Sequence, residues 1–201
     1  MAYRETVKIK ERKAAQREAL LLAAEQLVRA HGFAGLTIQA LAQNAGVGVG
    51  TVYRYFSAKD ELAAEVFRVA TQREVTAVSE AINVAGDVAE KLRHAVAVFA
   101  HRAMRAPRLA WALIAEPAEP AVDTERLQYR QAYADEFEML LQRGVEDKSL
   151  SPQNCALSAA ALVGAMAEAL VGPLANHDDE ALVIDQLQQF CLRAVGAIRA
   201  S

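Results

Sequence analysis

The sequence has few of the residues that cross-link a chain or interrupt it. Its 201 residues include two cysteines, and aromatic residues make up 6%. Cys155 and Cys191 are too few for a disulfide framework, and their spacing matches no metal site. We expect two buried thiols, and a redox role for them stays open. All five prolines lie beyond residue 100, so glycine alone punctuates the first half of the chain.

Long apolar segments are missing as well. No uncharged apolar run reaches the length of about 18 residues that a membrane span needs. The first residues, "MAYRETVKIKERKAAQRE", lack the apolar core of a signal peptide. We therefore expect a soluble, cytoplasmic protein.

Alanine and leucine dominate and β-branched runs are scarce, which favours an all-α chain. A chain of this length can bury a substantial core. Residues 1–60 carry nine Lys/Arg against five Asp/Glu, and residues 61–201 carry thirteen against twenty. A basic first part with an acidic remainder is typical of a protein whose first part binds a polyanion, although solvated helix faces give a milder version of the same pattern.

The apolar spacing predicts a first helix from about Glu11, which Gly32 would end in a left-handed conformation. A short helix follows, with Thr37 as its N-cap and Gly46 at its end. A second short helix is expected at about 49–56. The pair Ser57 and Asp60 then matches a capping signal for a long helix.

That long helix is expected to run from residue 57 to about 84. Breaks at prolines and at clusters of turn residues divide the rest of the chain. The further helices are expected at about 88–106, 108–116, 121–147, 153–174 and 179–200. The chain is therefore predicted to form about nine helices, four in a basic first part and about five in an acidic body.

The stretch "AGVGVGTVYRYFSAKDEL" has two possible interpretations. A dinucleotide-binding loop needs G-x-G-x-x-G after a strand, but Thr51 occupies the last position and the preceding segment is helical. The Gly-Lys-Ser/Thr of a P-loop is also absent. Two short helices joined at Gly46 instead have the layout of a helix-turn-helix motif over residues 37–56.

The side chains of this stretch agree with DNA binding. Gly48 and Gly50 each cost a helix interior about 1 kcal/mol relative to alanine. Close approach to DNA explains that cost, and so does close packing of the two short helices. Val52 and Phe56 are four residues apart and are expected to face inward. The outer side then carries groups that bind phosphates or base edges, namely Thr51, Tyr53, Arg54 and Tyr55.

The segment "TIQALAQNAGVGVGTVYRYFSAKDEL" resembles the DNA-binding signature of the TetR family of bacterial transcription regulators. The resemblance continues upstream through "AAEQLVRAHGFAGLT" and covers roughly residues 14–74. Gly48 departs from it, because many relatives carry a capping serine there. Glycine is an acceptable N-cap, so this departure costs little.

The resemblance implies a DNA-binding domain at 14–74 and a ligand-binding and dimerisation domain at 75–201. Residues 1–13 would form a basic arm, which is either a DNA contact or a solvated tail. Gln39 and Val49 are implied as DNA contacts mainly by the resemblance. The full set of expected DNA-binding residues is Thr37, Gln39, Gly48, Val49, Gly50, Thr51, Tyr53, Arg54, Tyr55 and Lys59.

The resemblance also implies a homodimer formed through the last two helices. The sequence permits this, because both segments carry small and apolar side chains. The expected interface residues are Leu157, Leu162, Met166, Leu170, Leu182, Leu187, Phe190, Leu192, Val195 and Ile198. An ordinary monomer core is the alternative.

A pocket for an unknown small-molecule effector is expected around the only tryptophan, because aromatic and polar residues gather there. The expected lining is His101, Trp111, Glu116, Tyr129, Tyr133 and Phe137. Aromatic residues at helical spacing form an ordinary core equally well. No cofactor, metal site or catalytic site is expected.

The chain is thus expected to be a DNA-binding regulator and not an enzyme. The favoured function is a repressor that binds a palindromic operator on double-stranded DNA as a dimer and is released by its effector. A ligand-responsive activator is the alternative. An all-helical enzyme or an interaction module without operator binding is more remote.

Overall fold

The computed structural model describes residues 7–176 and 178–197, and over these ranges it contains helices and connecting segments without strands. The predicted all-α fold is confirmed. One turn of 3₁₀ helix, η1 (Phe33–Gly35), follows the first helix. The α-helices are α1 (Val7–His31), α2 (Ile38–Asn44), α3 (Val49–Tyr55), α4 (Lys59–Ile82), α5 (Val88–Arg105), α6 (Pro107–Ile114), α7 (Pro120–Glu146), α8 (Cys155–Asn176) and α9 (Glu180–Ala194).

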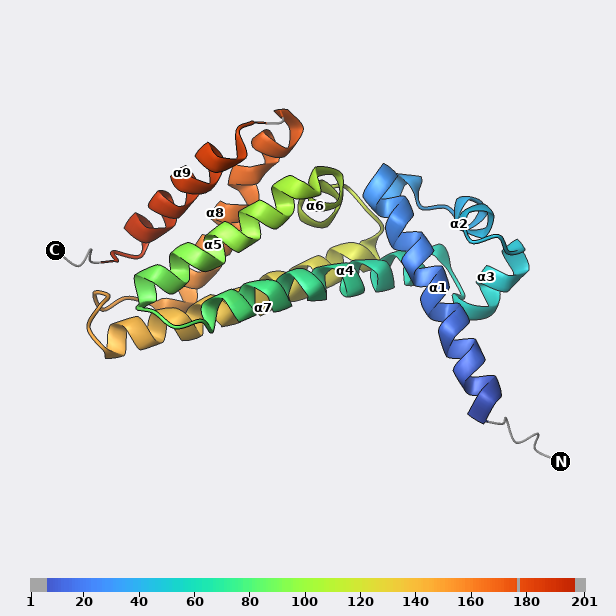
Figure 1. Ribbon diagram of the computed structural model, residues 1–201, viewed down its shortest axis with the longest axis horizontal. Coiled ribbons are helices and arrows are strands. Elements are labelled where there is room, and N and C mark those ends of the chain that lie inside the picture. The colour runs from blue at the N-terminus through green and yellow to red at the C-terminus, as the bar shows by residue number, and fades with distance from the viewer. Residues whose placement is uncertain (1–6, 177, 198–201) are drawn as a thin grey trace.

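Figure 1 shows a small head of α1, α2 and α3 at one end of an elongated body. Helix α4 leaves the head and runs side by side with α7 along the body. Two buried clusters of apolar residues correspond to these parts, and α4 contributes to the head cluster as far as Ala70 and to the body cluster from Val75. Helix α6 lies between the two clusters. Its Leu109, Ala112 and Leu113 pack into the head cluster, and its Ala110 packs into the body cluster.

Local signals start the helices of the body. Asp87 and Glu90 form a reciprocal capping box at the start of α5. Pro107 and Pro120 occupy the first turns of α6 and α7, where their missing N–H groups cost nothing. Asp179 caps α9 by accepting a hydrogen bond from the Leu182 amide. Because these signals are local, the helices begin close to their expected positions.

Three expectations about helix ends are wrong. Helix α1 begins at Val7, so residues 7–13 of the expected arm are helical, while residues 1–6 lie outside the described residues. Helix α9 ends at Ala194, short of the expected end at about residue 200. The capping pair of Ser57 and Asp60 does not form. Ser57 instead donates from its amide and its hydroxyl to Glu61, and α4 begins at Lys59.

Helix α8 is unusually apolar. Among the described residues it is the one helix long and apolar enough to cross a membrane, which by itself is weak evidence of a span. Its Leu162, Met166 and Leu170 are buried in the body cluster, as in a core helix of a globular protein. Only 28% of its most apolar window is buried, however, so much of the surface of this helix is exposed.

Candidate DNA-binding surface and ligand cavity

The turn between α2 and α3 has the geometry of a helix-turn-helix. Thr37 caps α2, because its hydroxyl oxygen accepts a hydrogen bond from the Ala40 amide at 3.0 Å. Gly46 ends the turn at a φ of 65°, in the left-handed region that favours glycine. Gly48 then acts as the N-cap of α3 without a side-chain bond, as expected. The exposed side of α2 carries Gln39.

The two glycines at the start of α3 are not explained by packing. A Cβ atom added to Gly48 or Gly50 would meet no other atom within 4 Å. The two short helices therefore leave open space above both positions. Of the two explanations for these glycines, close packing of the short helices is thus excluded, and close approach of DNA to the start of α3 remains.

Helix α3 presents one buried and one exposed side. Val52 and Phe56 are fully buried in the head core, as expected. Arg54 is exposed, Tyr53 is 52% exposed and Thr51 is half-buried, all on the outer part of the helix. Val49 is 39% exposed. The structure thus brings most of the expected DNA-binding residues onto one surface.

Two expected DNA contacts are engaged inside the protein. Tyr55 is half-buried, and its hydroxyl donates to Gln16 Oε1 of α1 at 2.9 Å, so it attaches α3 to α1. Lys59 forms an ion pair with Glu119, with 2.5 Å between Nζ and Oε1. Glu119 belongs to the linker between α6 and α7. No local sequence pattern pointed to either partner.

Glu116 was expected in the ligand pocket, and this expectation is wrong. Its carboxylate is buried and accepts hydrogen bonds from the amides of Phe33, at 2.8 Å, and Ala34, at 3.1 Å. A Cβ atom at Gly32, whose φ is 71°, would lie 2.6 Å from the same carboxylate. Glycine is therefore required at position 32 by its backbone and by Glu116. The linker between α6 and α7 thus holds the head at two points.

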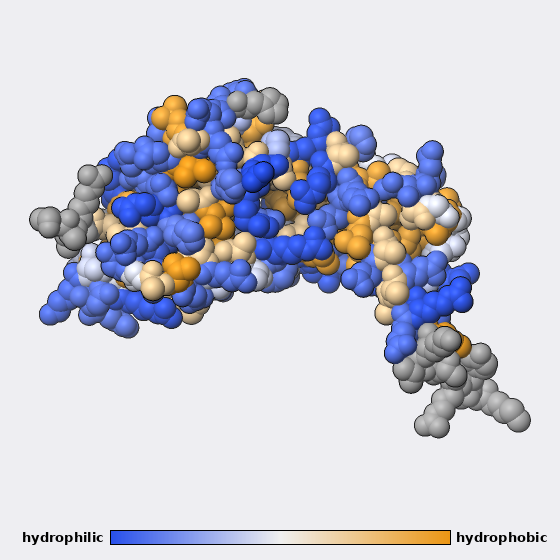
Figure 2. Space-filling model, in the orientation of Figure 1, coloured by the Kyte–Doolittle hydropathy of each residue, from blue (hydrophilic) through white to orange (hydrophobic). Residues whose placement is uncertain are grey.

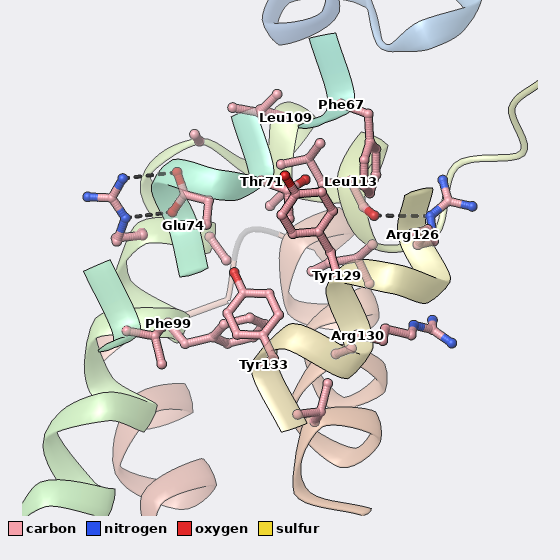
Figure 3. Close-up of a pocket in the computed structure, with 18 of the residues that line it drawn as sticks. Phe67, Thr71, Glu74, Phe99, Leu109, Leu113, Arg126, Tyr129, Arg130 and Tyr133 are labelled. Carbon is pink, nitrogen blue, oxygen red and sulfur yellow. Dashed lines mark hydrogen bonds and ion pairs between the residues drawn. The ribbon is translucent and has the colours of Figure 1, made fainter. Parts of the chain in front are cut away.

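A cavity of about 400 Å³ lies between α4, α5, α6, α7 and α8, close to the head (Figure 3). Three of the expected pocket residues line it, namely His101, Tyr129 and Tyr133. Trp111, Glu116 and Phe137 do not; Trp111 is 38% exposed at the surface and Phe137 is fully buried in the body core. The side of the cavity that α4 provides was not predicted from the sequence. Figure 3 shows Phe67, Thr71 and Glu74 from this helix.

One signal for this side was present in the sequence. Thr71 follows Phe67 and Ala70 and precedes Val75 and Val78, all of which are buried. Helical spacing therefore places a hydroxyl on the buried face of α4, and a buried polar group needs a partner.

Two of the arginines at the cavity, Arg102 and Arg126, already have partners. Arg102 donates to both carboxylate oxygens of Glu74, at 2.5 Å and 2.9 Å, and these hydrogen bonds raise the pKa of Arg102. Arg126 donates to the carbonyls of Ala112, Leu113 and Glu116 at the end of α6, and it pairs with Asp123. Burial lowers the pKa of Arg126. Burial raises the pKa of Tyr133, so its phenol stays protonated.

The last two helices carry both core and surface residues. Leu162, Met166, Leu170, Leu187 and Val195 were expected at a dimer interface, but they are buried within the chain's own body. Leu157, Leu182 and Phe190 are 67%, 56% and 47% exposed. Leu192 is partly buried, and Ile198 lies outside the described residues. Figure 2 shows the face in view as largely hydrophilic with scattered apolar residues.

Comparison with known proteins agrees with this arrangement. Residues 20–66 match the model described as "Bacterial regulatory proteins, tetR family". Residues 85–171 match the model described as "Tetracyclin repressor-like, C-terminal domain". No curated protein matches the chain.

Solved structures share the fold over nearly the whole chain. The fatty acid degradation regulator FadR from Bacillus halodurans is 21% identical, with 90% of this chain and 99% of that chain covered and a TM-score of 0.74. FadR from Bacillus subtilis, in complex with stearoyl-CoA, is 17% identical, with 90% and 99% covered and a TM-score of 0.76. The reduced form of E. coli NemR is 16% identical, with 92% and 100% covered and a TM-score of 0.73.

Proposed function

Since the chain belongs to the TetR family of bacterial regulatory proteins, and is thus a DNA-binding transcription regulator, we propose that it is an effector-released repressor. In this proposal it binds a palindromic operator as a homodimer in the cytoplasm, and it acts by binding rather than by catalysis. A small molecule in the cavity beside α4 releases it. One observation carries the proposal. The head has an exposed α3 surface, and α4 and α6, which contribute to the head core, also line the cavity.

The DNA contacts follow from the chemistry of the exposed side chains. Arg54 provides a guanidinium for a guanine edge or a phosphate, and Tyr53 and Thr51 provide hydroxyls for phosphates. Gln39, on α2, is exposed on the other helix of the motif. The open space above Gly48 and Gly50 lets a duplex approach the backbone at the start of α3. The proposed DNA-binding domain is 14–74, with the effector domain at 75–201.

The homodimer is proposed to form through the surface of α8 and α9 that the body leaves uncovered. Leu157, Leu182 and Phe190 are large exposed apolar side chains on this surface. On α8 they are accompanied by exposed small residues, Ala161, Gly164 and Gly172, which allow close helix packing. Pairing this surface about a two-fold axis would form a four-helix interface and present two copies of α3 to successive major grooves.

Release requires that the cavity and the head be connected. Leu109 and Leu113 of α6 line the cavity and also belong to the head core. Beyond α6, Glu116 and Glu119 contact η1 and α4. A ligand that moves α6 therefore strains the contacts that orient the head. The complex of Bacillus subtilis FadR with stearoyl-CoA gives a precedent in this fold for binding a small molecule.

Selection of binding sites from a random DNA library tests the proposal. We expect an inverted repeat whose half-sites lie about one helical turn apart, and a dimer in light scattering at micromolar concentration. Arg54→Ala should weaken binding or relax one position of the repeat, whereas the matched control Arg143→Ala, in the exposed last turn of α7, should leave the selected sequence unchanged. A single half-site bound by a monomer would contradict the proposal.

A further inference from the structure

The cavity beside α4 contains a hydroxyl without a partner. Thr71 is 5% exposed, and its Oγ1 atom makes no hydrogen bond among the described residues. A buried hydroxyl without a hydrogen bond destabilises a protein, so a partner is expected. Because Thr71 lines the cavity, a bound molecule can supply that partner.

A second hydroxyl lies nearby. Tyr133 of α7 is 7% exposed, and its ring packs edge-on against Phe99, with 5.6 Å between the ring centroids. No hydrogen bond of its hydroxyl is found within the described residues. Figure 3 shows the phenol directed toward α4, on the side of Glu74 and Thr71. Since the phenol stays protonated, it can donate a hydrogen bond as well as accept one.

Glu74, Arg102 and Arg126 line the cavity, and all three are paired within the part of the chain that the structure describes. Glu74 and Arg102 neutralise each other, and Arg126 is occupied by three carbonyls and Asp123. Arg105 and Arg130 also line the cavity, but both are exposed, and Figure 3 shows the Arg130 side chain extending away from the hollow. An ionised group buried beside Thr71 and Tyr133 would lose its hydration, and an anion there would gain an opposite charge only by drawing Arg105 or Arg130 in from the surface or by breaking an existing ion pair.

We propose that the cavity binds a compact, largely apolar molecule with a neutral oxygen function, a carbonyl or a hydroxyl, which hydrogen bonds to Thr71 and Tyr133. The inference rests on the proposed function, in which this cavity holds the effector. The volume of about 400 Å³ is near the small end of the range for ligand pockets. The aromatic rings of Phe67, Phe99 and Tyr129 supply apolar contacts around the oxygen function.

Matched probes on two skeletons test this class by titration calorimetry with the full chain and no DNA. The linear set is methyl hexyl ketone, octanol, octanoate and octylamine. The fused-ring set is acetonaphthone, naphthol, naphthoate and naphthylmethylamine. On at least one skeleton, the ketone or alcohol should bind at least about tenfold more tightly than the carboxylate and the amine.

Two variants test the contacts. Thr71→Val keeps the shape of the side chain and removes its hydroxyl, and it should weaken ketone binding by about threefold to tenfold. Tyr133→Phe should have a similar effect. Thr71→Ser retains a hydroxyl and should restore most of the affinity. Thr71→Val should also raise the melting temperature of the free protein by roughly 2–4 °C, because it removes an unpaired buried group.

The inference is overturned if the carboxylates bind as tightly as the ketones, if no probe binds, or if both hydroxyl-removing variants bind the ketone as the unmodified protein does. Its failure is distinguishable from that of the proposed function, because operator binding is measured separately and without probes. If the protein binds its operator but prefers the carboxylate probes, the proposed effector-controlled regulator stands, and only the inference of a neutral ligand is refuted.

Discussion

The ion pair between Lys59 and Glu119 leads to a prediction about DNA affinity. Lys59 stands at the start of α4, shortly after the end of α3, where an ammonium group can reach a DNA phosphate. In the free protein that ammonium lies 2.5 Å from the Glu119 carboxylate, and the two side chains are 36% and 19% exposed. With Lys59 as a phosphate contact of the proposed operator complex, Glu119 competes with DNA for its ammonium group. Removing the carboxylate by Glu119→Gln should strengthen operator binding.

The magnitude follows from the exposure of the pair. Exposed ion pairs contribute about 0.2–1 kcal/mol, and this pair, with one partner largely covered, belongs near the upper end. Breaking it to bind phosphate thus reduces affinity by a factor of up to about five for each protomer. Lys59→Ala should weaken binding to all sequences, and it should flatten the slope of log K against log salt concentration by about 0.9 for each protomer, which is roughly 1.8 for the dimer. In Lys59→Ala, the further change Glu119→Gln should give no comparable gain.

The assay is fluorescence anisotropy with labelled operator at several salt concentrations, on both single variants and the double variant. Glu146→Gln is the matched control, because it removes the same charge from the far end of α7, where Glu146 is exposed. The reasoning is refuted if Glu119→Gln leaves affinity unchanged. It is also refuted if the gain is equally large without Lys59, since a general charge effect would then suffice.

Three further predictions concern single groups. Glu116→Gln should lower the free energy of unfolding by about 1.5–3 kcal/mol in urea denaturation, because the charged acceptor of the Phe33 and Ala34 amides is lost. An NMR titration should place the pKa of Glu61 below its ordinary value, because the Ser57 hydroxyl and amide donate to it; Ser57→Ala should raise it. The stability that this lowered pKa contributes is present at neutral pH and is lost as the pH falls through it. Burial raises the pKa of Cys191 to about 12, so in the native protein a thiol reagent at mildly alkaline pH should leave Cys191 unmodified, and urea should expose it.

The helices were predictable because their signals are local. Asp87, Pro107 and Pro120 act within one turn of the helix that each begins, so a single sequence suffices to place those ends. The start of α4 shows the limit of such signals. Ser57 has two acidic residues within reach, Asp60 and Glu61, and the sequence pattern favoured the one that the structure does not use.

The candidate sites were predictable only in part, because their remaining contacts join distant segments. The exposed side of α3 follows from helical spacing alone. The partners of Glu116 lie more than 80 residues earlier in the chain, and no local pattern joins them. The cavity was placed around Trp111 because that residue is rare. In the structure Trp111 is partly exposed at the surface, and the cavity lies beside Thr71 instead. The position of Thr71 on an apolar helix face was therefore a better indicator of the cavity than the presence of a tryptophan.

The contacts at the end of α6 also indicate how large an effect the effector must have. Arg126 of α7 donates hydrogen bonds to the carbonyls at the end of α6. Just beyond α6, the Glu116 side chain accepts a hydrogen bond from Phe33 of η1. A useful switch needs a coupling free energy of about 1–3 kcal/mol between ligand and DNA. That is also the size of one hydrogen bond to a charged group, about 1.5–3 kcal/mol. A ligand that displaces α6 far enough to break one of these contacts would therefore supply the whole coupling, without any need to unfold the head.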